Sequence, residues 1–171
     1  MFWHYYFLAV ILASLTCQAI GTVEVKGQVT NDAEITKIEE FIKAHCENLK
    51  KMVTPYDKEY HVLISENAAK QIEGVLLYLK KPNNMWLLSA LCADKGKRRQ
   101  GISKGLMAKL EELAHTAKAT ITFQAISMEM AHLAKNRGYT LPSEDKSGAE
   151  LTDEDLELAV ECDSDWVKSF G

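Results

Sequence analysis

The chain has 171 residues, carries a net charge of −4 and is 47% hydrophobic. This length predicts one globular domain with its own core, because no Gly/Ser-rich linker or internal repeat divides the chain. The acidic balance argues against nucleic-acid binding, since the basic cluster is small and holds no aromatic residues. The cysteines lack metal-ligand spacing and the five histidines are scattered, so no metal site is expected.

The first 21 residues form an apolar segment with no charged residue from Phe2 to Val23. Small residues around Ala19 and Gly21 fit a signal cleavage site. We expect a signal peptide over residues 1–21, a domain over 22–171, and a place in the secretory pathway or outside the cell. The usual positive charge at the start is missing, so an uncleaved membrane anchor stays open, and a membrane is expected as a partner only in that case.

Strand and helix patterns alternate along the domain. Valines alternate with polar residues at the start, and Asn31 with Glu34 is a capping pattern for a helix that runs to about Lys51. Gly138 is placed to end a later helix. The expected strands are 22–29, 61–65, 72–79, 85–92, 120–125, 139–141 and 156–162, and the later helices are 104–116 and 127–137.

The segment between the apolar strand 85–92 and the next helix carries the basic cluster. Five basic residues and one acid lie between Asp94 and Lys104. The first N–H groups of a helix have no intrahelical partner and carry positive partial charge. Gly101 lets the backbone approach a ligand closely. Strand, basic turn and helix together predict a site for a phosphate-bearing ligand.

This turn resembles the acyl-CoA pyrophosphate loop of the GNAT N-acetyltransferase superfamily. The family motif R-x-x-G-x-G/A stands here as Arg98-Arg99-Gln100-Gly101-Ile102-Ser103, with Ser103 in place of the last small residue. The element order is also similar over nearly all of residues 22–171. The resemblance implies an α/β fold with a mixed, mostly antiparallel sheet flanked by helices. The match is weakest in the first helix region, where one long helix replaces the usual two.

The resemblance implies transfer of an acetyl group from acetyl-CoA to an amine of a small molecule or a protein. By the same resemblance, the backbone of Leu91 and Ala93 would pair with the pantetheine arm. Loop N–H groups would bind the pyrophosphate, and Lys97 and its neighbours would add charge. The pyrophosphate-binding positions carried over are Arg98, Arg99, Gln100, Gly101, Ile102, Ser103 and Lys104.

The catalytic groups common in that family are missing from the chain. The usual Tyr is replaced by Ala134, the strand before the loop carries no acid, and Ser127 stands where an Asn often lies. Glu73 is the remaining candidate base. Ser127 is a candidate donor to the leaving thiolate, although its more ordinary role is to cap a helix. The losses leave open a second function, a secreted protein of GNAT fold that binds without catalysis.

Three cysteines lie beyond the N-terminal segment. Cys92, in an apolar strand, is expected to be a buried free thiol, which leaves a Cys46–Cys162 disulfide open. Ten acidic residues and one Lys lie between Glu144 and Asp165. This charge favours a cationic amine as the acceptor, while an ordinary solvated acidic surface stays the alternative.

Overall fold

The computed structural model describes residues 22–46, 59–141 and 151–171. The signal peptide expected over 1–21 and the loop 142–150 lie outside the described residues. The helix expected to run to about Lys51 ends earlier, at His45, with Cys46 as its C-cap. The described strands are β1 (Thr22–Gln28), β2 (His61–Glu66), β3 (Ile72–Lys81), β4 (Met85–Ala93), β5 (Thr120–Gln124) and β6 (Asp165–Ser169). The described helices are α2 (Asp32–His45), α3 (Ile102–Ala117), α4 (Met128–Asn136) and α5 (Asp153–Glu161).

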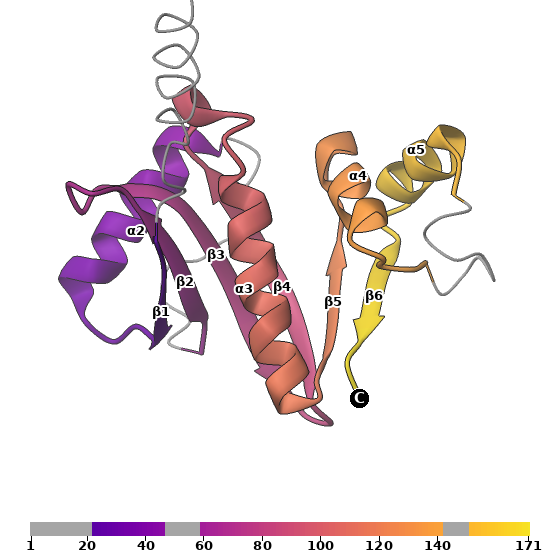
Figure 1. Ribbon diagram of the computed structural model, residues 1–171, viewed down its shortest axis with the longest axis horizontal. Helices are drawn as coiled ribbons and strands as arrows, with labels where there is room; N and C mark the ends of the chain where they lie inside the picture. The colour runs from indigo at the N-terminus through magenta and orange to yellow at the C-terminus, as the bar shows by residue number, and fades with distance from the viewer. Residues whose placement is uncertain (1–21, 47–58, 142–150) are drawn as a thin grey trace, which may run out of the picture.

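The strands form one six-stranded sheet in the order β1-β2-β3-β4-β5-β6. Neighbouring strands are antiparallel except β4 and β5, which run parallel with α3 as their connection (Figure 1). A parallel pair needs such a crossover, whereas antiparallel strands can be joined by short turns. The expected fold class, a mixed and mostly antiparallel sheet flanked by helices, is confirmed.

Both faces of the sheet are covered by helices. Side chains alternate between faces along a strand, so Leu63 of β2 packs in the cluster with α3 while Val62 and Ile64 pack in the cluster with α2. Helices α3, α4 and α5 cover the first face, and α2 covers the second. Their buried side chains recur at helical spacing, as Leu106 and Leu110 do in α3.

A β-bulge changes the facing of β4 halfway along the strand. Leu77 of β3 pairs with Ala90, and the next residue, Tyr78, pairs with Leu88, which leaves Ser89 as the extra residue. Leu88 therefore packs on the α3 side, whereas Ala90 packs on the α2 side. Bulges redirect side chains in this way and are common beside functional sites.

The strand expected at 156–162 is wrong, because this segment is helix α5. Thr152 and Asp155 form a capping box, in which Thr152 N donates to Asp155 Oδ2 at 2.7 Å and Asp155 N donates to Thr152 Oγ1 at 3.2 Å. Leu156 and Ala159 are buried, while Leu158 is 53% exposed. The spacing is thus helical, and the last strand is Asp165–Ser169 instead.

Two smaller expectations also differ from the structure. The segment 139–141 contributes a single bridge, between Thr140 and Val167, in place of a strand. The Asn31 side chain does cap α2 by accepting from Ala33 N at 2.9 Å, but Glu34 pairs with Lys26 at 3.3 Å across to β1.

The expected free thiol at Cys92 and the open Cys46–Cys162 pairing are both wrong. Cys46, directly after α2, forms a disulfide with Cys92 of β4, with Cα atoms 6.0 Å apart. Beyond the bulge, Cys92 faces α2, which brings it within disulfide reach of the end of that helix. Cys162 is free and exposed after α5. Among the described residues, no helix is both long and apolar enough to cross a membrane.

Candidate active site

Strands β4 and β5 pair at their beginnings and then diverge. Their ladder consists of Met85–Thr120, Trp86–Ile121 and Leu87–Thr122. Beyond these pairs, β4 continues against β3 alone, and β5 continues against β6 alone. Figure 1 shows the two strands separating from this point, with α3 on the β4 side and α4 after β5. The divergence starts directly before the bulge at Ser89.

The free edge of β4 presents the backbone of Leu91 and Ala93. Asp94 N donates to Glu73 O at 2.8 Å, and Ala93 lies opposite Gly74. In an antiparallel ladder, alternate residues direct their N–H and C=O groups toward the partner strand or away from it. Asp94 bonds to β3, so the residues one and three positions before it, Ala93 and Leu91, direct their backbone N–H and C=O groups away from β3 and toward the divergence. These are the strand positions expected from the sequence.

The loop after β4 is held by its own backbone. Asp94 Oδ1 accepts from Gly96 N at 2.8 Å, which starts a short 3-10 helix, Lys95–Lys97. Gly101 then precedes α3 with φ +82°, a conformation that favours glycine. It provides no side-chain cap, so the first N–H groups of α3 have no capping side chain. Open space surrounds the position of a Cβ at Gly101.

Helix α3 begins in direct contact with β3. A Cβ added to Gly74 would overlap Ile102 Cγ2 and would lie 3.0 Å from Leu106 Cδ1. The glycine therefore allows the first turn of α3 to approach the sheet closely. This contact fixes the helix N-terminus beside the end of β4.

Polar contacts hold the loop to β3 and to the end of α2. Glu73 is the extra residue of a second bulge, in β3, because Ser65 pairs with Gly74 and Glu66 pairs with Ile72. Its carboxylate is paired with Lys97 Nζ of the loop. The Glu73 residue is 8% exposed. His45, the last residue of α2, places Nδ1 3.3 Å from Asp94 Oδ1 and 3.2 Å from Lys95 N. The neutral imidazole accepts from Lys95 N–H, and a protonated one would donate to Asp94.

The opposite wall is the start of α4. Ser127 caps this helix, accepting from Met130 N at 3.3 Å. The pKa of Glu129 is lowered, first by its own backbone N–H, then by a hydrogen bond with Ser127 and by the positive charges of Arg98 and His132. Arg98 of the loop therefore acts on α4 from across the divergence. The capping role considered for Ser127 is confirmed.

The Tyr position of the family, Ala134, supplies no hydroxyl, and the nearby Tyr139 does not replace it. Ala134 is fully buried in the core, as is Tyr139 directly after the helix. The Tyr139 ring packs edge-on against Phe123, with ring centroids 5.0 Å apart, and burial raises the pKa of its hydroxyl far above the usual range. Its phenol therefore stays protonated within the core.

The structure distributes the sequence-predicted residues over three places. Leu91, Ala93 and the loop line the β4 edge of the divergence, and Ser127 lies on the α4 wall. Glu73 lies at the bulge of β3, paired with Lys97 of the loop. Sequence analysis missed His45, because a lone histidine at a helix end has no distinguishing pattern and its partner Asp94 is far away in sequence. Within the described part of the chain, no group of three or more His, Cys, Asp or Glu side chains could hold a metal ion.

Comparison with known proteins identifies this architecture. Residues 26–139 match the family model for an acetyltransferase (GNAT) domain. A GNAT-family acetyltransferase from Staphylococcus aureus is similar at 17% identity and TM-score 0.60, covering 88% of this chain and 100% of that one. The YhbS N-acetyltransferase from Escherichia coli, solved with CoA, is similar at 10% identity and TM-score 0.61, covering 89% and 82%.

Tetrahymena GCN5 shares the fold at 11% identity and TM-score 0.62, with 86% of this chain and 96% of that one covered. No curated protein sequence matches the chain significantly. The matched model spans the first helix, the diverging strands, the basic loop and the start of the α4 wall. The chain therefore belongs to the GNAT acetyltransferase family.

Proposed function

We propose that this protein is an N-acetyltransferase that transfers an acetyl group from acetyl-CoA to an amine. The observation that carries the proposal is the free backbone edge of β4, which continues into the uncapped start of α3. The N–H and C=O groups of Leu91 and Ala93 match the amide groups of a pantetheine arm. The N–H groups from Ile102 onward and the basic loop match a pyrophosphate.

Acetyl-CoA supplies an activated thioester. The amine must be neutral to attack it, whereas a lysine-like amine with pKa ~10.4 is mostly protonated near pH 7. A proton acceptor is therefore needed. Two side chains beside the loop are candidates for this role: the Glu73 carboxylate, paired with Lys97, and the His45 imidazole, beside Asp94. Histidine is a common general base, and His45 Nδ1 lies 3.3 Å from Asp94 Oδ1.

Two further features support the setting of this function. The Cys46–Cys92 disulfide fits an oxidising compartment, in agreement with a signal peptide over 1–21. The exposed acids of α5 favour a cationic amine, since opposite charge attracts the acceptor. We propose a lumenal or secreted enzyme that acts on such an amine.

Calorimetric titration with acetyl-CoA and CoA tests the donor site. We expect micromolar binding, which is lost when Gly101 and Ser103 are both replaced by Val. Gly138→Ala is the matched control for backbone strain, because Gly138 has φ +74° and open space around it. A folded protein that binds neither compound would contradict the proposal.

Steady-state rates over pH, measured on an amine panel, then separate the two bases. Loss of His45 or Glu73 as base should lower kcat by about 10²-fold or more while CoA affinity is retained. His115→Gln, on the exposed side of α3, is the control. CoA binding without turnover of any amine would favour the alternative function, a GNAT-fold binding protein without catalysis, for which the buried Ala134 at the Tyr position argues.

A further inference from the structure

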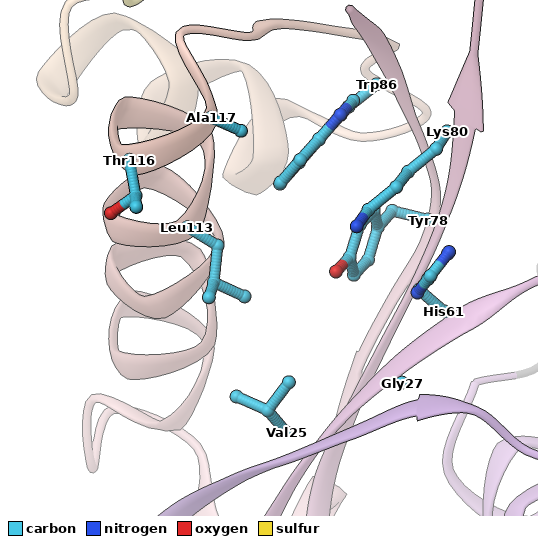
Figure 2. Close-up of a pocket in the computed structure, with 9 residues that line it drawn as sticks. All are labelled: Val25, Gly27, His61, Tyr78, Lys80, Trp86, Leu113, Thr116 and Ala117. Atoms are coloured by element: carbon cyan, nitrogen blue, oxygen red, sulfur yellow. The ribbon is translucent and has the colours of Figure 1, made fainter.

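A hollow lies between α3 and the sheet, at the end of α3 that is away from the basic loop. Its volume is about 400 Å³, within the usual size range of small-molecule sites. Figure 2 shows the side chains that line it, which come from β1, β2, β3, β4 and the last turns of α3. The lining residues are Val25, Gly27, His61, Tyr78, Lys80, Trp86, Leu113, Thr116 and Ala117.

Aromatic rings form the floor of this hollow. His61, Tyr78 and Trp86, on three neighbouring strands, stack in sequence with 5.2 Å between successive ring centroids. Tyr78 is 2% exposed and Trp86 is 5% exposed, so both rings are fixed in the sheet. Leu113 of α3 and Val25 of β1 face this floor (Figure 2). The space between them suits a flat apolar group.

Lys80 and Tyr78 offer hydrogen-bond donors to the hollow. Lys80 Nζ lies 4.9 Å from the centroid of the Trp86 ring and forms no ion pair with any described carboxylate. Figure 2 shows the Lys80 ammonium and the Tyr78 hydroxyl directed into the space between the sheet and α3. Burial raises the pKa of Tyr78, so its hydroxyl stays a donor at neutral pH. None of the nine lining residues is acidic.

The hollow is separate from the divergence of β4 and β5. Trp86 lies at the start of β4 and Ala93 at its end, about 23 Å apart at 3.3 Å per residue. Ala117 ends α3, whose first residue, Ile102, lies at the basic loop about 22 Å away. No lining residue of the hollow belongs to the β4 edge or to the loop.

We propose that this hollow is a second ligand site, which binds a small aromatic carboxylate. The ring would lie on the aromatic floor beneath Leu113. The carboxylate would accept hydrogen bonds from Lys80 Nζ and the Tyr78 hydroxyl, giving the lysine the anionic partner that the described residues do not provide. A cationic ligand is disfavoured because Lys80 would repel it and no lining carboxylate would pair with it.

The test uses three naphthalene probes on the purified full chain: 2-naphthoate, 2-naphthalenemethanol and 2-naphthylmethylamine. We expect 2-naphthoate to bind at least tenfold more tightly than the other two by calorimetry. Lys80→Met should remove this preference. Lys81→Met, one residue along β3 and also exposed, removes the same charge from the opposite face and should leave binding within twofold.

Amide and indole NMR signals locate the bound probe. We expect shifts at His61, at the Trp86 indole N–H and at Ala117 on addition of 2-naphthoate, with or without saturating CoA. Equal binding of all three probes, equal effects of the two lysine variants, or no binding at millimolar concentration would overturn the proposal. Because the Gly101/Ser103 variant lacks only the donor site, its unchanged 2-naphthoate affinity would separate this proposal from the acetyl-transfer proposal.

Discussion

The two ends of the α3–sheet layer hold their ligand-facing groups in different ways. At the loop end, the Cys46–Cys92 disulfide and the contact of His45 with Asp94 hold the end of β4 to α2, and the groups left facing the divergence belong to the backbone. At the hollow end, stacked rings fix the surface, and the groups that face the space belong to side chains. Both ends include part of β4, and the bulge at Ser89 lies between the part that faces the divergence and the part that lines the hollow.

This difference explains how much each end constrains the sequence. A backbone edge tolerates many side chains, so the loop end needs only Gly74 and Gly101 for close approach and backbone conformation. The hollow depends on the identities of Tyr78, Trp86 and Lys80. Substitutions at the loop end should therefore act by straining the backbone or its packing. Substitutions at the hollow end should act by removing side chains that contact the ligand.

The largest effect is expected from removal of the disulfide. Cys46→Ser combined with Cys92→Ala should lower the free energy of unfolding by about 2–4 kcal/mol, because the cross-link closes a long loop in the unfolded chain. CoA affinity should fall as well, since β4 is released from α2. Denaturant unfolding and calorimetry measure both effects.

Cys162→Ser is the matched control, because Cys162 is exposed and free. It should change stability by less than about 0.5 kcal/mol. An equally small loss in the double variant would contradict the view that the disulfide fixes the loop end.

A smaller effect is expected at the contact between β3 and α3. Gly74→Ala should cost about 1–3 kcal/mol, because the new methyl group meets Ile102 and Leu106. By displacing the start of α3, it should weaken CoA binding while leaving 2-naphthoate binding unchanged. A parallel loss at both ends would indicate that they are not independent.

The smallest effect concerns pH at the hollow end. Burial, with the charge of Lys80, lowers the pKa of His61 below 6.5. The unfolded chain then binds the proton more readily, so this contribution to stability is complete above pH 6.5 and is lost as the pH falls through the folded pKa. NMR titration of the imidazole should show the lowered pKa in the wild type and a higher pKa in Lys80→Met. A His61 pKa insensitive to Lys80 would contradict their proximity.

Local patterns predicted the order of elements at the loop end well. The apolar strand, the basic turn with Gly101, the helix after it and the Ser127 cap are each encoded within a few residues, and the structure contains all of them, although α3 begins at Ile102 and not at Lys104. Leu156, Leu158 and Val160 alternate as in a strand, but the segment is a helix, whose start is stabilised by the capping box of Thr152 and Asp155. Short apolar alternation does not by itself distinguish strand from helix.

Features assembled from distant segments could not be predicted. The Cys46–Cys92 pair depends on the bulge, which turns Cys92 toward α2. His45 meets Asp94 only because α2 ends beside β4. The hollow gathers side chains from five elements, each of which appears in the sequence as an ordinary core or surface position. Such contacts follow from register and packing, which one sequence does not reveal.

The most direct test of the central claim is an amide NMR map of the protein titrated with CoA. The account predicts the largest shifts at Leu91, Ala93 and residues 101–104, with His61 and Trp86 unchanged. Shifts confined to the hollow, or spread evenly over the sheet, would contradict a donor site built on the free edge of β4.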